Sequence, residues 1–249
     1  DLVNVERIPD ADTAYFRGIE FRRAYSTALR KTDVKYGGVN YSGGVDVDGC
    51  RFADNAPDYS FADTSYAYAS AIAAFIDGGE ARKSKFRCAN TLFDGNVTTN
   101  TSGTAGWYWG STMVVNIKEI GSAEFVGCQF VTNGIPFTQK LGVPPSGAPR
   151  HSPFDASLVD FNDMASLTVR DCEFRGNRTH AISQNGYYQP MVYARRVGAP
   201  ESWQCAFTNC LFVGNEVTHA TAMDNHVVFM NNRGILCIAE RVIVTYLLQ

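Results

Sequence analysis

The chain has 249 residues, of which 45% are hydrophobic and 19% are charged, so it can bury a large continuous core. Its net charge of −3 lacks the positive excess of nucleic-acid-binding proteins, and no nucleic-acid partner is expected. No apolar run approaches the roughly 20 residues that span a bilayer, so no membrane span is expected either. Asp1 follows no signal peptide, which fits a processed protein or part of a longer one. A local basic excess is expected to be a solvated face or part of a cap: Arg17, Arg22, Arg23, Arg30, Lys31 and Lys35.

In chain order, the first predicted strand unit lies at 16–24, and units of the same pattern follow up to residue 225. The signature of the unit is Phe-x-x-Asn, with Cys or Thr two positions before the Phe and an apolar residue or Cys five positions before it. The steps between copies are unequal, which indicates a constant structural unit with loops of variable length. The good copies are Phe52 with Asn55, Phe93 with Asn96, Phe130 with Asn133, Phe174 with Asn177, and Phe212 with Asn215.

The ends of the repeat array are degenerate. Near the start, Ile19 replaces the Cys of the unit and Ala24 replaces the Asn, and the last unit contains no Phe-x-x-Asn. Terminal repeats must shield the core from water, so atypical ends are expected. We therefore predict one domain over 1–249 with about six to seven coils, divided into a degenerate first coil or cap at 1–35, regular coils with lateral loops at 36–225, and a partial coil at 226–249.

Each unit is predicted to form β-strands. The segment 167–170 alternates apolar and polar side chains, as a strand with one buried face does, and a second apolar strand precedes it at 158–161. Stacking coils about 4.8 Å apart places like residues over like. This predicts a core column of the motif Phe residues and a ladder of the motif Asn residues at a bend with unusual backbone angles. It also predicts an inward column at Cys50, Cys128, Cys172 and Cys210.

These residues resemble a known repeat family. Gly37-Gly38-Val39, followed by Val45 to Asn55, is similar to the Gly-Gly-Ala-Ile and Phe-x-x-Asn repeats of chlamydial polymorphic outer-membrane proteins. The resemblance covers roughly residues 14–240 and implies an all-β fold, a right-handed parallel β-helix of the pectate-lyase-like type. It does not imply one function, because this solenoid occurs in adhesins, filament proteins and enzymes. At the position of Gly37, other coils carry Ser70, Ser111 or Ser157.

The seven cysteines leave two interpretations open. Small thiols pack well in an inward slot, so the cysteine column is consistent with free buried thiols. The coil spacing also falls within the ~4.4–6.8 Å Cα separation of a disulfide, so at least one bridge, such as Cys172–Cys210, is the alternative. Cys205 and Cys237 are a further candidate pair.

Four Asn-x-Ser/Thr sequons indicate a secreted or cell-surface protein. Asn100 lies in a polar loop and is the best candidate for glycosylation, and Asn40 is a second one outside the asparagine ladder. Asn96 and Asn177 also carry sequons, but burial in the ladder is incompatible with an attached glycan.

The loops after each Asn are expected to leave the stack along one edge, and loops on a rigid scaffold commonly carry function. They are rich in aromatic side chains, for which three roles are open: packing against the flank of the coils, burial between subunits, or stacking against sugars. The candidates for an interface or a glycan-binding surface are Tyr66, Tyr68, Trp107, Tyr108, Trp109, Tyr187 and Tyr188.

Residues suited to catalysis are few. His180 and His219 fall at similar positions of adjacent units, but no Cys or carboxylate joins them in phase, so a polar stack is favoured over a metal site. Asp160, Asn162 and Asp163 form the best acidic group, yet this pattern does not recur in other coils. No catalytic, cofactor-binding or metal-binding residue is therefore predicted.

The sequence thus predicts a non-catalytic extracellular structural protein, the building block of a filament, coat or cell-surface assembly. Protein partners or self-assembly are expected through the aromatic loops and the coil ends, because unpaired strand edges favour end-to-end association. A polysaccharide is the other partner class. The alternatives are a glycan-binding adhesin and, second, a polysaccharide lyase or hydrolase of the β-helix fold.

Overall fold

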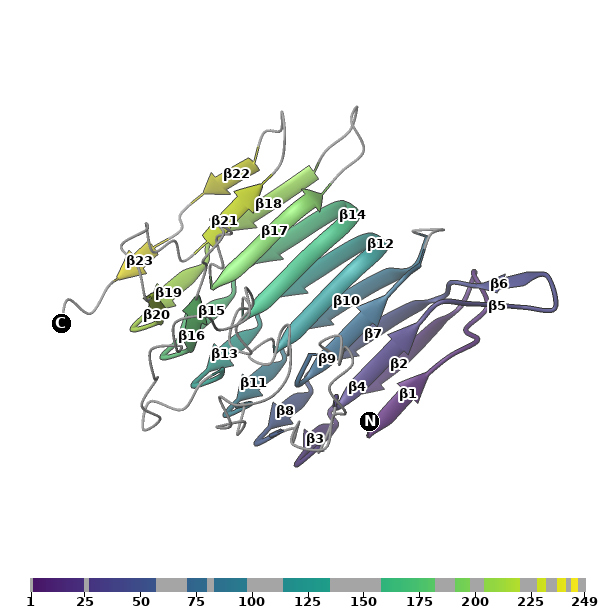
Figure 1. Ribbon diagram of the computed structural model, residues 1–249, viewed down its shortest axis with the longest axis horizontal. Helices are drawn as coiled ribbons and strands as arrows, with labels where there is room; N and C mark the ends of the chain where they lie inside the picture. Colours follow the sequence, from purple (N-terminus) through teal and green to yellow (C-terminus); the bar gives the residue numbers. More distant parts are fainter. Residues whose placement is uncertain are drawn as a thin grey trace, which may run out of the picture.

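The computed structural model describes residues 2–24, 27–56, 71–79, 83–97, 114–134, 158–181, 191–197, 204–219, 228–231, 237–240 and 243–245. Within these residues the chain is all β, as predicted, and strands of successive circuits pair in parallel (Figure 1). The described residues include no helix that is long and apolar enough to cross a bilayer.

The strands form three parallel rows, and each circuit of the chain, called a coil below, visits the rows in the same order. The first row contains β1 (Val3–Val5), β4 (Leu29–Thr32), β9 (Ala74–Asp77), the first halves of β12 (Val115–Val126) and β14 (Val159–Arg170), β17 (Val192–Val197) and β21 (Val228–Asn231). The second row contains β2 (Thr13–Arg17), β7 (Gly44–Asp48), β10 (Lys85–Ala89), the second halves of β12 and β14, β18 (Gln204–Thr208) and β22 (Cys237–Glu240).

The third row is a separate sheet that carries the Phe-x-x-Asn motif. It contains β3 (Glu20–Arg22), β8 (Arg51–Ala53), β11 (Leu92–Asp94), β13 (Gln129–Val131), β15 (Glu173–Arg175), β19 (Leu211–Val213) and β23 (Ile243–Thr245). Two small sheets complete the described structure: the parallel pair β16 (Arg178–Ala181) and β20 (Glu216–His219), and an antiparallel hairpin, β5 (Val34–Tyr36) and β6 (Val39–Tyr41).

Two bends flank the strands of the third row. The residue three positions before each motif Phe and the residue two positions after it have a left-handed backbone, with φ between 48° and 62°. Gly, Asn and Asp reach this region at the lowest cost, which explains their recurrence there, as at Gly49 and Asp54. The motif asparagines themselves have no positive φ, so the prediction that they occupy the strained position is wrong.

Phenylalanine rings stack face to face along the core from Phe21, in the degenerate first unit, to Phe212. Neighbouring ring centroids are 4.5–5.0 Å apart, and the ring planes lie within 6° of parallel. The in-register pairing of the third row sets each ring over the next. The rings are 2% exposed or less, so they exclude water along this side of the core. The full stack is Phe21, Phe52, Phe93, Phe130, Phe174 and Phe212.

The hairpin β5–β6 projects from the stack (Figure 1). Gly37 and Gly38 form its turn with φ of 57° and 82°, as a two-residue hairpin loop with both central residues left-handed requires. The predicted alignment of this Gly-Gly pair with the starts of later coils is therefore wrong. Strand register instead places Leu29 level with Ala74, Val115 and Val159.

Candidate functional site

The asparagine ladder lies inside the stack, directly after the third row. Along it, the side-chain amide donates to the Phe carbonyl of the preceding coil and to the amide oxygen of the next Asn, at 2.8–3.1 Å. Asn133, for example, donates to Phe93 and Asn177 and accepts from both the backbone and the side chain of Asn96. All four hydrogen-bonding positions of its amide are used, so the ladder is structural.

Replacing Asn133 with alanine is expected to lower the free energy of unfolding by about 1–3 kcal/mol, because its buried partners in both adjacent coils lose hydrogen bonds. Asn40→Ala is the matched control, since Asn40 is exposed on the hairpin. Urea unfolding followed by circular dichroism measures both changes. Equal and negligible losses in the two variants would show that the ladder does not stabilise the fold.

Burial in the ladder removes two of the predicted glycosylation sites. Asn96 and Asn177 are 0% exposed, and their amide nitrogens, to which a glycan would be attached, donate to neighbouring coils. The folded chain therefore cannot carry glycans at these two residues. Asn40 is exposed on β6, and Asn100 lies outside the described residues.

The predicted cysteine column is buried and reduced. Cys50, Cys128, Cys172 and Cys210 are 3% exposed or less and form no disulfide, so the alternative of a Cys172–Cys210 bridge does not describe this structure. Thr91 takes the equivalent position in the coil between Cys50 and Cys128. Its hydroxyl accepts a hydrogen bond from the Cys50 backbone N–H at 3.4 Å, which separates Cys50 from the other thiols of the column.

Cys88 joins this column from the second row. Its sulfur lies 3.7 Å from that of Cys128, although the two residues occupy different positions of the repeat. Comparison of like positions alone therefore missed this contact. Cys205 is level with Cys237 in the pairing of β18 with β22, and Cys205 is not disulfide-bonded.

The sequence predicted seven aromatic residues as a protein interface or a glycan-binding surface. All of them lie outside the described residues: Tyr66, Tyr68, Trp107, Tyr108, Trp109, Tyr187 and Tyr188.

The polar residues weighed for catalysis do not gather into a metal-binding group. The described residues hold no cluster of three or more His, Cys, Asp or Glu side chains suited to a metal ion. Asp160, Asn162 and Asp163 are 6–8% exposed in β14. Strand register sets Asn116 and Tyr193 beside Asp160, and Lys118 and Arg195 beside Asn162, so no further carboxylate is level with either. His180 pairs with a threonine of β20 and His219 with an alanine of β16, so the two histidines are not level.

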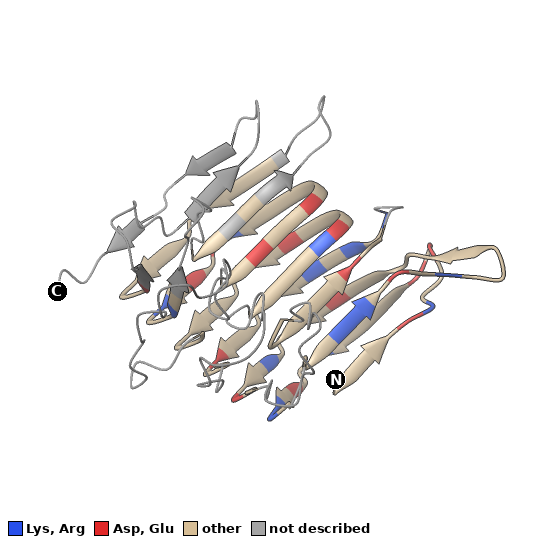
Figure 2. Ribbon diagram, in the orientation of Figure 1, with Lys and Arg blue, Asp and Glu red and all other residues tan. Residues whose placement is uncertain are grey.

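Charged side chains link neighbouring coils on the outer surface. Arg17 and Arg87 approach Asp46 from the coils on either side, each at 3.0 Å. Arg22 pairs with Asp54 across a coil boundary at 2.7 Å. Figure 2 shows basic and acidic residues interspersed over these strands. Exposed ion pairs contribute little stability, but here they pair two of the six basic residues near the start, Arg17 and Arg22, with carboxylates.

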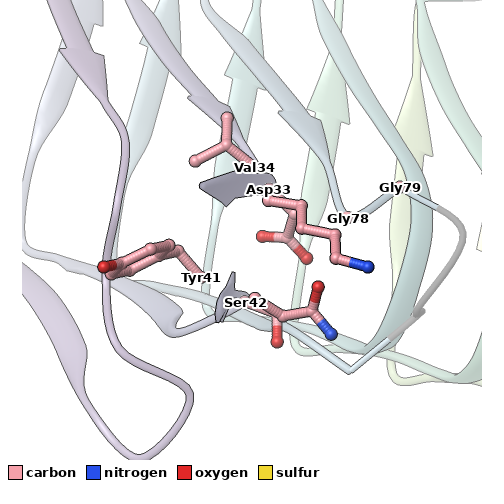
Figure 3. A pocket seen from close by; sticks show the side chains of 8 residues that line it. Asp33, Val34, Tyr41, Ser42, Gly78 and Gly79 are labelled. Carbon is pink, nitrogen blue, oxygen red and sulfur yellow. The ribbon is translucent and has the colours of Figure 1, made fainter. Parts of the chain in front are cut away.

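A cavity of about 440 Å³ lies between the hairpin and the turn at Gly78–Gly79 (Figure 3). Its lining mixes polar and apolar groups and includes Asn40 and Ser42. Figure 3 shows the Asp33 carboxylate pointing into the space, while the Tyr41 ring extends away from it. The cavity therefore borders the carboxylate of Asp33, which also contacts the buried side chain of Lys31.

Lys31 occupies an inward position of the first row, level with Val5 and Ile76. It is 2% exposed, and its ammonium group donates to the Asp33 carboxylate. Burial lowers the pKa of Lys31 and raises the pKa of Asp33, and their hydrogen bond opposes both shifts. The expectation that Lys31 lies on a solvated face is wrong, because strand register turns it into the core.

The outer edge of the first coil is formed by β1, β2 and β3, and we call it the first-coil edge. Each of these strands pairs with one described strand, toward the stack, and with none on its outer side. The inward side chains Val3, Val5, Ala14 and Phe16 are only partly buried, whereas Val47, level with Phe16, is 0% exposed. Large apolar side chains are also exposed here: Leu2 (50%), Tyr15 (66%) and Ile19 (40%).

Comparisons with protein-family models, curated proteins and solved structures gave no match for this chain. The first-coil edge is the candidate site on its own geometry. Among the described residues it combines strands with no pairing partner on their outer side, partly buried core side chains and exposed apolar side chains, all of which favour contact with another protein.

Proposed function

We propose that this chain is a right-handed parallel β-helix that serves as a non-catalytic structural unit outside the cell, in a filament, coat or cell-surface assembly. The observation that carries the proposal is the first-coil edge, whose strands have no described strand on their outer side. Three rows visited in a constant order support the helix, and parallel crossover connections are almost always right-handed. The exposed sequon at Asn40 supports secretion, and the repeat resembles that of chlamydial surface proteins.

The partner that fits the first-coil edge best is the last coil of a second copy. Among the described strands, β21, β22 and β23 pair only with the coil before them, so the far end of the stack presents the same three rows. All rows are parallel, so copies stacked head to tail continue every row in one direction. Such a contact joins two different surfaces, and it generates an open fibre when the rotation does not close a ring.

Head-to-tail stacking also covers the apolar groups that the edge leaves accessible. The partly buried Val3, Val5 and Phe16 would gain a neighbouring layer of side chains, as the equivalent residues of inner coils already have. Burying apolar area stabilises an association by about 25 cal/mol per Å² before the entropy cost of binding. The edge thus offers both hydrogen bonds and hydrophobic contact to a second copy.

Sedimentation velocity over a range of protein concentrations tests the proposal, with electron microscopy to show the shape of the particles. The wild-type chain is expected to form larger, elongated species as its concentration rises. Tyr15→Lys combined with Ile19→Lys is expected to weaken association about 10-fold or more, because lysines on a strand edge oppose pairing.

The matched control is Leu92→Lys combined with Val131→Lys, which adds the same charge on outward positions of inner strands. This control should assemble like the wild type, and both variants should keep the wild-type circular dichroism spectrum. A wild-type chain that stays monomeric at every concentration contradicts the proposal. So does equal loss of assembly in the edge and control variants.

A further inference from the structure

The cavity beside the hairpin contains a buried carboxylate oxygen that lacks a hydrogen-bond donor. The Asp33 side chain is 8% exposed, and its carboxylate points into the cavity (Figure 3). Its Oδ1 accepts from the Lys31 ammonium group, whereas Oδ2 is buried and accepts no hydrogen bond from the described part of the chain. A buried charged acceptor without a donor is costly, so this oxygen favours an occupant of the cavity that donates to it.

The neighbouring groups hold the carboxylate in place without satisfying this oxygen. The Asp33 backbone N–H donates to the Asp77 carbonyl at 2.8 Å, which fixes the residue at the end of its strand. Burial raises the pKa of Asp33, and Lys31 and Ser84 oppose that shift. The Ser84 hydroxyl oxygen is itself buried and has no hydrogen-bond partner among the residues that the structure describes, so Asp33 Oδ2 remains available to a ligand.

The hairpin side of the cavity is also fixed. Ser42, which follows β6, donates to the Asp10 carboxylate from its backbone N–H at 3.0 Å and from its hydroxyl at 2.8 Å. The Ser42 hydroxyl oxygen can still accept a hydrogen bond. On the far side, a Cβ at Gly79 would lie 3.9 Å from that of Asp33, so the absence of a side chain there keeps the space beside the carboxylate open.

We propose that this cavity binds one neutral sugar ring, with a sugar hydroxyl donating to Asp33 Oδ2. Its volume of about 440 Å³ lies within the roughly 300–1,000 Å³ that is typical of small-molecule sites. A cationic ligand is disfavoured because the Lys31 ammonium group already binds the same carboxylate. An anionic ligand is disfavoured because Oδ2 carries negative charge and has no other donor to shield it.

The other lining groups match the chemistry of a sugar. Each sugar hydroxyl both donates and accepts, so one ring can donate to Asp33 and Ser42 and exchange hydrogen bonds with the Asn40 amide. Val34 and the backbone of Gly78 line the same space and offer contact to the C–H groups of the ring. The site is formed by residues other than those of the first-coil edge, so it adds a binding role that does not depend on assembly.

Saturation-transfer difference NMR tests the proposal on the full chain, produced in bacterial cells so that Asn40 carries no glycan. The probes are the methyl glycosides of glucose, galactose, mannose and N-acetylglucosamine. At least one is expected to bind with a Kd of about 1 mM, given the modest binding energy per atom of such ligands. The methyl glycoside of glucosamine, which places a cation on the same ring, is expected to bind at least about 10-fold more weakly than that of N-acetylglucosamine.

Variants tie the binding to the carboxylate. Lys31→Ile combined with Asp33→Ala removes the acceptor and leaves no buried charge, and it is expected to fold because Ile76 holds the same inward position in the next coil. It should weaken sugar binding about 10-fold or more, since a hydrogen bond to a charged group is lost. Val39→Ala is the matched control, because Val39 is 54% exposed on the same hairpin and does not line the cavity.

The control variant, and the edge variant Tyr15→Lys with Ile19→Lys, should bind the sugar like the wild type. Failure of all four neutral glycosides to bind at up to about 10 mM overturns the proposal. So does unchanged affinity in a double variant that keeps the wild-type circular dichroism spectrum. Tighter binding of the glucosamine glycoside also overturns it, and that comparison uses the wild-type chain and is independent of how any variant folds.

Discussion

Replacing Phe130 with alanine is expected to lower the free energy of unfolding by about 3–5 kcal/mol. Its ring lies between those of Phe93 and Phe174, at 4.5 and 4.6 Å, and is 1% exposed. Removing it leaves a cavity with a ring on either side, and the backbone hydrogen bonds of the third row prevent the coils from closing the gap. Urea unfolding with an unchanged m-value measures the loss.

Gln129→Ala provides the matched control for this experiment. Gln129 precedes Phe130 in β13 and points to the solvent side of the same strand. Its replacement is expected to change stability by no more than about 0.5 kcal/mol. A loss at Phe130 as small as that at Gln129 would mean that the stacked rings do not support the core.

Replacing Asp33 with alanine is expected to destabilise the fold by about 3–5 kcal/mol, because it leaves the Lys31 ammonium buried without its hydrogen-bonded partner. Lys31 and Asp33 have side chains only 2% and 8% exposed, so solvent does little to replace the lost contact. Guanidinium or urea unfolding at neutral pH measures the change.

The double variant Lys31→Ile with Asp33→Ala separates the lost contact from the cost of burying charge. Isoleucine matches Ile76 and Ile117, which lie at the same inward position of the next two coils. This variant should be within about 1 kcal/mol of the wild type or more stable, since apolar replacement of a buried ion pair is commonly neutral or favourable. If the double variant loses as much stability as Asp33→Ala alone, the lone buried charge is not the cause.

The pH dependence of the ion pair follows from its two pKa shifts. Asp33 has a raised pKa in the folded chain, so its stability contribution is present below its ordinary value of 3.8 and is lost as pH rises through the folded pKa. Lys31 has a lowered pKa, so its contribution is present above 10.5 and is lost as pH falls through the folded pKa. Between the folded pKa of Asp33 and the folded pKa of Lys31, both contributions are absent. The free energy of unfolding of the wild type should therefore be lowest, relative to that of the double variant, in this pH range.

The third row was predictable from sequence because its motif combines two demands that few arrangements meet. A Phe that recurs in every coil must be buried in one continuous apolar column. An Asn three positions later must find hydrogen-bond partners in the coils above and below it. In-register parallel stacking satisfies both, as Phe130 and Asn133 show. The left-handed bends were wrongly predicted to lie at the motif asparagines. Asn recurs at that position because of its side-chain hydrogen bonds, not because of its tolerance of a left-handed backbone.

Features outside the repeat were harder to predict. Lys31 follows the alternation of its strand, but a lysine is normally placed on the solvent side, and its long apolar stem allows burial only because Asp33 accepts its ammonium group. Gly37 and Gly38 serve a hairpin turn that the repeat does not contain. The Cys88–Cys128 contact crosses between two rows and depends on side-chain reach, which no comparison of equivalent positions reveals.

The two left-handed bends of each coil are separated by the same five positions from Gly18 and Arg23 to Asn209 and Gly214, whereas the segments between coils differ in length. Because the boundaries from Phe52 to Phe212 repeat the same ring stacking and Asn hydrogen bonds, a duplication or deletion of one of these circuits would leave the remaining boundaries intact. The length of the stack can thus change in evolution through the number of coils. The segments that connect the coils can meanwhile change in sequence and length under separate selection.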